Sequence, residues 1–333
     1  MSETVAVVGA GSWGTALATL LAGNGHSVRI WSRGEEVAGL INREHENRVY
    51  LPGVRLDPSL RATTSMSEAL DGASFVVMVV PSHAMRPTMQ KVAPLVSDEA
   101  PIVSASKGIE DGTSKTMFEV ILDCAGEPER IGVLSGPSFA AEVAAGLPTV
   151  VVAAARRMEM AERIQRTFAG STFRVYSSTD VVGVEIGGVV KNIMAIATGV
   201  SDGLGYGDNA RAALITRGLA EISRLAAALG ARPETLSGLS GIGDLVLTCT
   251  GDLSRNRQFG LRLGRGETVD EILSSMRMVA EGVRNTKAVR ELGARLGIEL
   301  PIVEVAYQVL YEGLPPREAL GRLFSRSLKP EFH

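Results

Sequence analysis

The sequence predicts an α/β protein in which a doubly wound, mainly parallel sheet is followed by an all-α domain. Up to about residue 180, short runs rich in valine and isoleucine alternate with helical patterns, and beyond that point only helical periods continue. With 333 residues, the chain also exceeds the usual size of a single core. We therefore expect one domain over residues 1–180 and a second, helical domain over residues 181–333.

Five short runs in the first half are apolar throughout, and a small or polar residue closes each of them. This pattern is typical of parallel strands that are covered on both faces, with right-handed crossover helices between them. The runs cover residues 5–9, 28–31, 75–80, 101–106 and 131–136. Two further runs, 149–154 and 173–178, are expected to extend the sheet as outer strands.

The second half carries its apolar residues at the spacing of helices. Residues 181–200 have this period, and a second long helix over residues 209–230 is expected to end at Gly230. The same pattern predicts helices over residues 255–264, 281–297 and 301–311. The helix over 181–200 also has a second stripe of mainly small residues, which leaves room for another group against its backbone. The stripe comprises Glu185, Gly188, Asn192, Ala195 and Gly199.

The composition is that of an ordinary globular protein, with 45% apolar and 21% charged residues. A net charge of -3 argues against nucleic acid as the main partner. Cys124 and Cys249 cannot form a disulfide framework and lack metal-ligand spacing, which favours a reducing, cytoplasmic setting. The four histidines are far apart, so no metal site is expected. We expect no signal peptide, and the longest apolar stretch is too short to span a membrane.

The stretch "GAGSWGTALA" (residues 9–18) fits the dinucleotide-binding fingerprint, because it follows an apolar run and precedes a helical pattern. Gly9 permits the tight turn, and Gly11 lets a pyrophosphate approach backbone N–H groups at the helix N-terminus. Gly14 lets the helix pack close to the strand. The first domain is therefore predicted to be Rossmann-like and to bind a dinucleotide.

The residue at the end of the second strand bears on which dinucleotide binds. Such sites usually have an acid there, which accepts a hydrogen bond from the ribose 2′-OH, but this sequence has Arg33 and no acid before Glu35. A guanidinium pairs with a 2′-phosphate instead, so NADP(H) is favoured and NAD is not excluded. The alternative is an arginine in a solvated turn.

Two lysines could serve hydride transfer to a ketone, which needs a proton donor and a means of holding the substrate. Lys107 in "SASKG" follows the strand expected over residues 101–106, at the sheet edge where ligands bind. Lys191 and Asn192 lie in a helix that is otherwise apolar or small. The alternatives are a solvated loop lysine at position 107 and a lysine that only reaches water at position 191.

A third polar stretch is "GIGDLVLTCTGDLSRNRQFG", residues 241–260. Asp244 follows glycines and precedes an apolar run, and Ser254, Arg255 and Asn256 open a helical segment. A hydroxyl, a guanidinium and an amide at a helix N-terminus can hold a phosphate. The alternative is that Ser254 only caps the helix and Arg255 is solvated.

Together, eight ordered stretches resemble the NAD(P)-dependent glycerol-3-phosphate dehydrogenases of the bacterial type. They run over nearly the whole chain: "GAGSWGTALA", "NRVYLPG", "VPSHAMR", "SASKGIE", "LSGPSFAAEV", "VEIGGVVKNIMAIATGVSDGLG", "GIGDLVLTCTGDLSRNRQFG" and "AEGVRN". The resemblance implies that dihydroxyacetone phosphate and sn-glycerol 3-phosphate are interconverted with NAD(P)(H). It also implies that the product serves as the precursor of phospholipid backbones.

The resemblance further implies roles for matched residues. Lys191 matches the catalytic acid/base of the family, and Lys107 matches a lysine that contacts both substrate and cofactor. The residues that match substrate contacts are Gly136, Ser138, Asp244, Ser254, Arg255 and Asn256. The residues that match cofactor contacts are Ser12, Trp13, Arg33, Tyr50, Ala140, Arg255, Val279 and Glu281. Many relatives have a second basic residue after Arg33, whereas this sequence has Gly34, which weakens the expected preference for NADP.

The residues suggest one mechanism. Lys191 is expected to give a proton to the carbonyl oxygen as hydride arrives, while Lys107 and Asn192 polarise that oxygen. Arg255 would hold the phosphate. Two lysines at one desolvated site lower each other's pKa, and Asp244 opposes that shift.

Two rival hypotheses stay open. Another β-hydroxyacid or sugar-phosphate dehydrogenase of the same plan explains the glycines and Lys191, but not "DLSRNR". A redox sensor that binds NAD(P) without turnover leaves Lys107, Lys191 and Asp244 without a role. Apolar surfaces of the helical half indicate a homodimer, and His83 in "VPSHAM" either acts near the nicotinamide or only packs.

Overall fold

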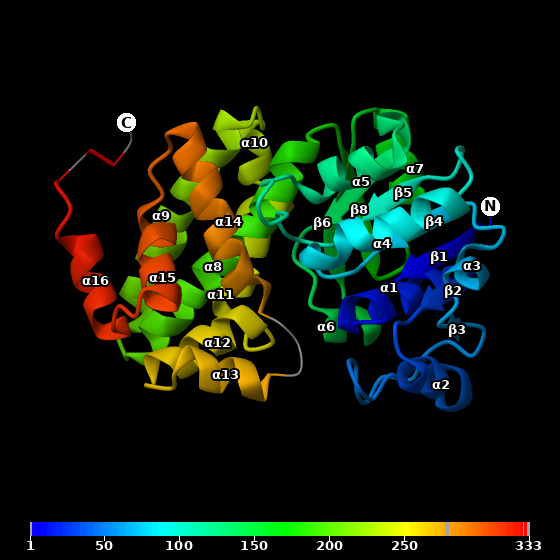
Figure 1. Cartoon of the computed structure of the whole chain (residues 1–333), viewed down its shortest axis with the longest axis horizontal. Helices are drawn as coiled ribbons and strands as arrows, with labels where there is room; N and C mark the ends of the chain where they lie inside the picture. Colours follow the sequence, from blue (N-terminus) through cyan, green and yellow to red (C-terminus); the bar gives the residue numbers. More distant parts are fainter. Residues whose placement is uncertain (1, 277–279, 329, 332–333) are drawn as a thin grey trace. The chain divides into compact units, whose positions relative to one another are not determined.

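The computed structural model describes residues 2–276, 280–328 and 330–331 (Figure 1). Strands and helices alternate over the first half. In order they are β1 (Thr4–Val8), α1 (Ser12–Gly23), β2 (Ser27–Trp31), α2 (Glu35–Glu44), β3 (Arg61–Thr63), α3 (Met66–Leu70), β4 (Phe75–Met78), η1 (Ser82–Ala84), α4 (Met85–Val92), η2 (Ala93–Leu95), β5 (Ile102–Ser104), α5 (Met117–Ala125), η3 (Pro128–Arg130), β6 (Ile131–Ser135), α6 (Ala140–Ala144), β7 (Thr149–Ala155), α7 (Met158–Phe168) and β8 (Phe173–Ser178).

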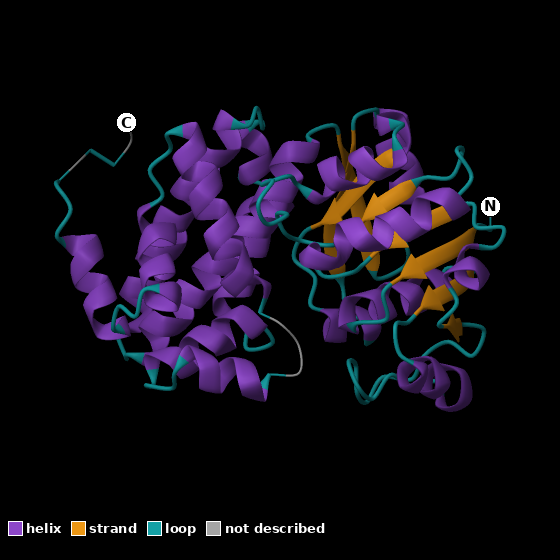
Figure 2. Ribbon diagram, viewed as in Figure 1, coloured by secondary structure: helices purple, strands orange, loops and turns teal. Residues whose placement is uncertain are grey.

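In the second half, the regular elements of the described residues are all helices, joined by loops (Figure 2). They are α8 (Val181–Gly203), α9 (Gly207–Ala228), α10 (Pro233–Leu236), η4 (Leu239–Gly243), α11 (Asp244–Thr250), α12 (Arg255–Gly264), α13 (Val269–Ser275), α14 (Glu281–Leu296), α15 (Pro301–Tyr311) and α16 (Pro316–Phe324). The five helices predicted from periodicity are confirmed as α8, α9, α12, α14 and α15. The remaining helices of this half have nine residues or fewer and were not predicted, because so short a segment carries too little periodicity to recognise.

The chain divides into two compact units. The sheet unit comprises Met1–Gly188 with Gly230–Asp244, and the helical unit comprises Val189–Leu229 with Leu245–His333. Helix α8 therefore contains residues of both units. The predicted domain boundary between residues 180 and 181 is a different division and stays a prediction.

The sheet has eight strands in the order β3-β2-β1-β4-β5-β6-β7-β8. All neighbouring pairs are parallel except β6 and β7, which run antiparallel. The predicted doubly wound, mainly parallel sheet is confirmed, including the two outer strands β7 and β8. Strand β3 was missed, because three residues with a half-exposed pattern carry little signal.

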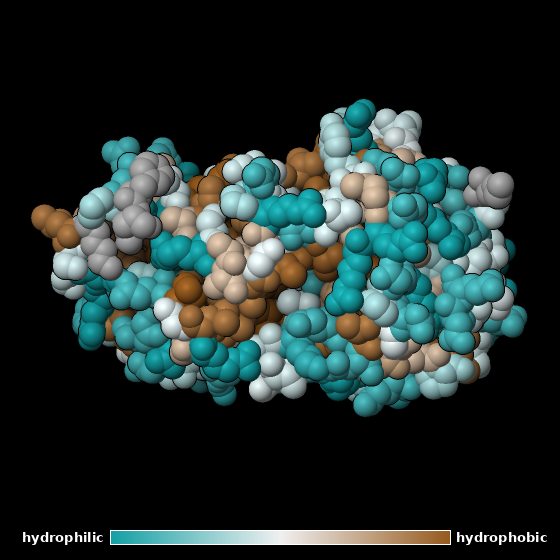
Figure 3. Space-filling model, turned by 90° about the horizontal axis from the view of Figure 1, so that it is seen from above, coloured by the Kyte–Doolittle hydropathy of each residue, from teal (hydrophilic) through white to brown (hydrophobic). Residues whose placement is uncertain are grey.

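Both faces of the sheet are covered, as the continuous apolar runs predicted. In β1, Val5 and Val7 pack into a core cluster with residues of α1 and α7, whereas Ala6 and Val8 belong to a cluster with residues of α4 and α5. All four side chains are fully buried. Figure 3 shows one side of the molecule, where the outer surface of the sheet unit, on the right, is mainly hydrophilic.

Among the described residues, α8 is the one helix long and apolar enough to cross a membrane by length and composition. However, 89% of its apolar window is buried within the fold. This burial is what the core helix of a globular protein requires, so its composition needs no membrane to explain it. The small-residue stripe of this helix is confirmed, since a Cβ on Gly199 would lie 2.2 Å from the Arg257 carbonyl oxygen of α12.

Glu221 on α9 makes the stability of the helical unit depend on pH. Its carboxylate accepts hydrogen bonds from the backbone N–H groups of Ile302 (2.6 Å) and Val303 (3.3 Å) at the start of α15. Burial raises the pKa of Glu221 to about 7, from an ordinary value of 4.5. A group with a raised folded-state pKa stabilises fully below its unfolded pKa, and that stability is lost as pH rises through the folded pKa.

We therefore expect the wild type to lose roughly 3 kcal/mol of unfolding free energy between pH 4.5 and pH 8 through this one group. Glu221→Gln stays neutral and keeps an acceptor oxygen, so it should be less sensitive to pH and more stable than the wild type at pH 8. Thermal unfolding of both proteins at pH 5.5 and pH 8 measures this difference. Parallel pH profiles would show that Glu221 does not titrate in this range.

Candidate functional site

The turn between β1 and α1 has the geometry that its glycines predicted. Gly9 has φ +121°, and a Cβ there would lie 2.5 Å from the Val79 carbonyl oxygen. A Cβ on Gly14 would lie 1.9 Å from the Gly9 carbonyl oxygen, so the helix packs directly on the turn. By contrast, nothing lies within 4 Å of a Cβ on Gly11, which is the N-cap residue of α1. No side chain caps this helix N-terminus, so its N–H groups are presented to an anion.

A loop from the β2–β3 connection lies against this turn. Asn47 is fully buried and donates to the Ala10 carbonyl oxygen (2.9 Å) and to the Thr15 hydroxyl (2.8 Å). Its own amide oxygen accepts from the Tyr50 N–H (3.1 Å), and the Ser12 hydroxyl donates to the Tyr50 carbonyl oxygen (2.5 Å). Ser12 and Tyr50, both predicted as cofactor contacts, are therefore brought together. Asn47 was missed, although it opens the "NRVYLPG" stretch.

The other predicted cofactor residues include one just beyond the end of β2, one in the first turn of α1 and one at the start of α6. Arg33 is exposed just beyond the end of β2, where the adenosine ribose was expected. The Trp13 indole N–H is buried in the first turn of α1 with no hydrogen-bond partner, and Ala140 begins α6. Val279 lies outside the described residues.

Lys107 and Asp244 meet within the sheet unit, although 137 residues separate them. The Lys107 ammonium donates to Asp244 Oδ2 (2.6 Å) and to the Gly136 carbonyl oxygen (3.1 Å). The Asp244 side chain is 1% exposed and that of Lys107 19% exposed. A pair this buried is a fixed ion pair rather than a solvated lysine, so the structure does not support the alternative for Lys107.

The surroundings of Lys107 include two more predicted substrate residues. Gly136 has φ +140°, and the Ser138 hydroxyl donates to its carbonyl oxygen (3.0 Å). On α8, a Cβ on Gly188 would lie 2.8 Å from Ser135 Oγ and 3.5 Å from Lys107 Cδ. The glycine thus lets the helix backbone lie against the lysine, as the small-residue stripe predicted.

Lys191 is buried in the helical unit. Only 6% of it is exposed, and its ammonium donates to the Thr248 hydroxyl (3.0 Å) on α11. The alternative of a lysine that reaches water is therefore wrong. Thr248 was missed by the sequence reasoning, but it stands one helical turn after Asp244 in an otherwise apolar run, which is a readable signal.

Asn192 and Asn256 are joined in the same unit. Asn256 Nδ2 donates to Asn192 Oδ1 (3.0 Å), and Asn256 Oδ1 accepts from the Gly282 N–H (2.9 Å). Both side chains belong to residues less than 10% exposed. This chain of bonds ties α8, α12 and α14 together, next to the predicted phosphate residues.

The predicted phosphate residues begin α12. Ser254 is the N-cap residue and accepts from the Arg257 N–H (3.2 Å), so the capping interpretation is confirmed. Arg255 lies in the first turn, where desolvation lowers the pKa of its guanidinium and the carboxylate of Glu281, which begins α14, opposes that shift. A cationic guanidinium and a capped helix N-terminus on one element are compatible with a phosphate.

The buried cysteine, His83 and possible metal-binding groups were considered as further reactive groups of the described chain. Burial raises the pKa of the Cys249 thiol to about 12, so this cysteine is not a nucleophile near neutral pH. His83 is exposed in η1. Among the residues that the structure describes, no group of three or more His, Cys, Asp or Glu could hold a metal ion.

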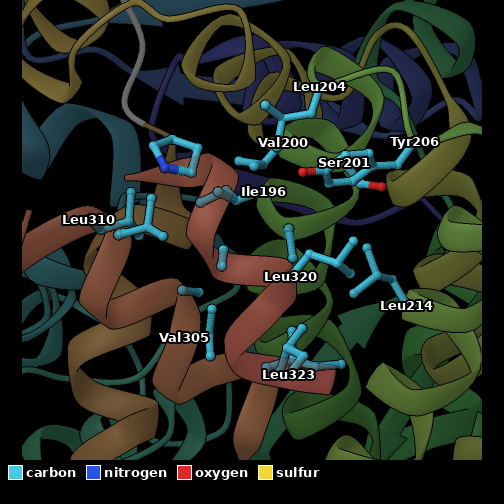
Figure 4. Close-up of a pocket in the computed structure, with 16 residues that line it drawn as sticks. Ile196, Val200, Ser201, Leu204, Tyr206, Leu214, Val305, Leu310, Leu320 and Leu323 are labelled. Atoms are coloured by element: carbon cyan, nitrogen blue, oxygen red, sulfur yellow. The ribbon is translucent and has the colours of Figure 1, made fainter. Parts of the chain in front are cut away.

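An apolar cavity of about 60 Å³, open to solvent, lies within the helical unit (Figure 4). Helices α8, α9, α15 and α16 line it, and side chains such as Ile196, Val200 and Leu320 point toward its interior (Figure 4). Among the described residues that line it, none is charged, and Ser201 and Tyr206 supply the hydroxyls. A phosphorylated substrate finds no cationic partner there.

Two family models match the chain over most of its length. The N-terminal model of NAD-dependent glycerol-3-phosphate dehydrogenase matches residues 4–161, and the C-terminal model of the same family matches residues 180–321. The chain is also 56% identical over 328 residues to the glycerol-3-phosphate dehydrogenase [NAD(P)+] of Anaeromyxobacter dehalogenans (strain 2CP-C). This match covers 98% of the chain and 99% of that relative.

Solved structures show the same similarity. The crystal structure of glycerol-3-phosphate dehydrogenase from Coxiella burnetii has a TM-score of 0.93 and 42% identity, and covers 98% of this chain and 99% of that one. A ketopantoate reductase from Ralstonia eutropha JMP134 has a TM-score of 0.60 and 16% identity over 96% of this chain and 100% of that one. The latter similarity concerns the fold alone.

Proposed function

Because the chain belongs to the NAD-dependent glycerol-3-phosphate dehydrogenase family, we propose that it interconverts dihydroxyacetone phosphate and sn-glycerol 3-phosphate with NAD(P)(H). The observation that carries the proposal is the buried Lys191 ammonium beside Thr248, because reduction of a ketone requires a positioned proton donor. The rival β-hydroxyacid or sugar-phosphate dehydrogenase is not favoured, since the full-length relatives share the family name.

The proposed cofactor-binding site is centred on the turn at Gly11. A helix N-terminus whose N-cap residue, Gly11, has no side chain and has open space around its Cα suits the pyrophosphate of a dinucleotide. Gly9, Gly11, Ser12, Trp13 and Gly14 are proposed to hold that end. Further cofactor contacts are proposed for Arg33, Tyr50, Lys107, Ala140, Arg255, Val279 and Glu281. When bound, NAD(P)H supplies the hydride.

The catalytic step is proposed to follow the residue roles expected from the sequence. Lys191 gives its proton to the carbonyl oxygen of the ketone and regains it from solvent after the product leaves. Asn192 donates a hydrogen bond to that oxygen, and Lys107, fixed by Asp244, polarises it. Gly136 and Ser138 contribute to the substrate pocket.

The phosphate of the substrate is proposed to bind at the start of α12. Ser254, Arg255 and Asn256 present a hydroxyl, a guanidinium and an amide there. Arg255 supplies the charge, because its planar fork can donate two parallel hydrogen bonds to phosphate oxygens.

The first experiment is oxidation of NADPH and NADH, followed at 340 nm, with dihydroxyacetone phosphate and with unphosphorylated dihydroxyacetone. We expect turnover that depends on the phosphate, and a loss of this dependence in Arg255→Ala through a raised KM. Absence of turnover with either ketone and either cofactor would refute the proposal.

Arg33 is expected to set the preference between the two cofactors. Arg33→Ala should raise the KM for NADPH about tenfold and leave the KM for NADH nearly unchanged, because only NADPH carries the 2′-phosphate. Exposure of Arg33 and the glycine at position 34 keep the effect moderate. Equal changes for both cofactors would mean that Arg33 does not contact the 2′-phosphate.

The metabolic role, the cellular compartment and the oligomeric state of the enzyme are also proposed. Its product would feed phospholipid synthesis, and two free cysteines fit a reducing cytoplasm. Exposed apolar side chains of the helical unit, Phe324 (79% exposed) and Tyr311 (45%), favour a homodimer. The mass of the protein in solution, measured by light scattering, tests the dimer.

A further inference from the structure

Four charged residues form an ion network around the loop that carries Lys107. They are Arg86 on α4, Glu110 and Lys115 in the loop of residues 105–116, and Asp123 on α5. All four belong to the sheet unit. Arg86 and Glu110 end the stretches "VPSHAMR" and "SASKGIE", but no role in the proposed function uses either side chain.

Arg86 is the centre of this network. Its Nε and Nη2 atoms donate to the two oxygens of Glu110, both at 2.8 Å, and Nη2 also donates to Asp123 Oδ2 at 2.8 Å. Arg86 and Glu110 are 29% and 15% exposed. A two-bond, partly buried pair is stronger and more directional than an exposed surface ion pair. Arg86 also lowers the pKa of Glu110, so the pair is charged at neutral pH.

The far end of the loop is held by the same network. Lys115 donates to both oxygens of Asp123, at 2.8 and 2.6 Å. The two arms of the loop are joined by the Glu110 N–H, which donates to the Lys115 carbonyl oxygen (2.9 Å). The Thr113 hydroxyl donates to Glu110 Oε2 (2.7 Å). Glu110 and Lys115 are thus fixed to α4 and α5 as one piece.

Lys107 lies between two attachments of this loop to the segment that follows β4. On one side, the Ser106 hydroxyl donates to the Val80 carbonyl oxygen (2.6 Å). On the other side, Glu110 is bound by Arg86, which follows β4 on α4. The backbone at position 107 is therefore held at the carboxyl edge of β4 and β5, where ligands of doubly wound sheets bind.

We propose that Arg86 and Glu110 are a positioning pair that fixes Lys107 for catalysis. This inference rests on the proposed function, in which Lys107 polarises the substrate carbonyl. Neither Arg86 nor Glu110 has to touch the substrate. A shift of about 1 Å in a catalytic group is enough to cost up to about 100-fold in rate, so a loosened loop should impair the reaction without unfolding the protein.

The test compares Arg86→Met and Glu110→Gln with the wild type in reduction of dihydroxyacetone phosphate. Each is expected to lower kcat/KM about tenfold or more, mainly through KM if Lys107 acts in binding and through kcat if it acts in the transition state. The double variant should be no worse than the worse single variant, because both changes break the same pair. Arg157→Met, which breaks exposed ion pairs with Glu129 and Glu159 in the same unit, is the control and should leave kcat/KM unchanged.

A second cycle separates positioning from a general structural role. In a Lys107→Met background, Arg86→Met should have less than about a threefold further effect on kcat/KM, because its target is gone. An equal loss in both backgrounds would overturn the proposal, as would wild-type kinetics of Glu110→Gln. Glu110→Gln keeps the shape of the side chain, so it carries the test if Arg86→Met does not fold. If the wild type itself does not reduce the ketone, the proposed function fails first; a wild type that works beside unaffected variants rejects only the positioning role.

Discussion

Lys191→Met is expected to lower kcat by about 10³-fold or more, because it removes the proposed proton donor and keeps the shape of the side chain. The lysine is 6% exposed, so methionine replaces a buried ammonium with a buried thioether and the fold should tolerate it. Single-turnover oxidation of NADPH at 340 nm measures the chemical step, and thermal unfolding checks the fold.

Thr248→Val is the companion variant. It removes the hydroxyl that accepts from the Lys191 ammonium and leaves the lysine in place. We expect a loss of about tenfold in kcat, because the donor remains but is less well oriented. If a folded Lys191→Met protein kept kcat within threefold of the wild type, the proton would have to come from another group.

Gly11→Ala and Gly14→Ala are expected to fail in different ways. Nothing lies within 4 Å of a Cβ on Gly11, so the variant should fold with a melting temperature within a few degrees of the wild type. Its methyl group would occupy the space proposed for the pyrophosphate, and the Kd for NADPH should rise about 100-fold or more. Fluorescence titration with NADPH measures this affinity.

At position 14 there is no space for an added methyl group. The Cβ of Gly14→Ala would lie 1.9 Å from the Gly9 carbonyl oxygen, which is backbone and cannot move aside without distorting the turn. We expect a loss of about 3 kcal/mol or more in unfolding free energy, together with weak cofactor binding. The two variants thus distinguish a loss of cofactor binding in a stable protein from a loss of stability. Normal NADPH affinity in a folded Gly11→Ala protein would contradict the proposed cofactor position.

Much of the fold could be read from local patterns. The strand runs were recognisable because a strand buried on both faces is apolar throughout, and the long helices because their apolar residues recur at the helical period. The predictions from the sequence were wrong at the end of one strand and for one very short strand. The run at residues 75–80 overshoots β4, which ends at Met78, and the three residues of β3 were not seen.

The sequence by itself determined which residue types could do chemistry: the glycines of the first turn, the lysines at 107 and 191, and the polar start of α12. These are local facts, because a turn, a buried lysine or a helix start is encoded in a few neighbouring residues. The tertiary structure decided their partners. Lys107 meets Asp244 across 137 residues, Lys191 meets Thr248 across 57, and Arg86 meets Glu110 from the neighbouring strand connection. Such pairings depend on how whole strands and helices pack, and no local pattern contains that information.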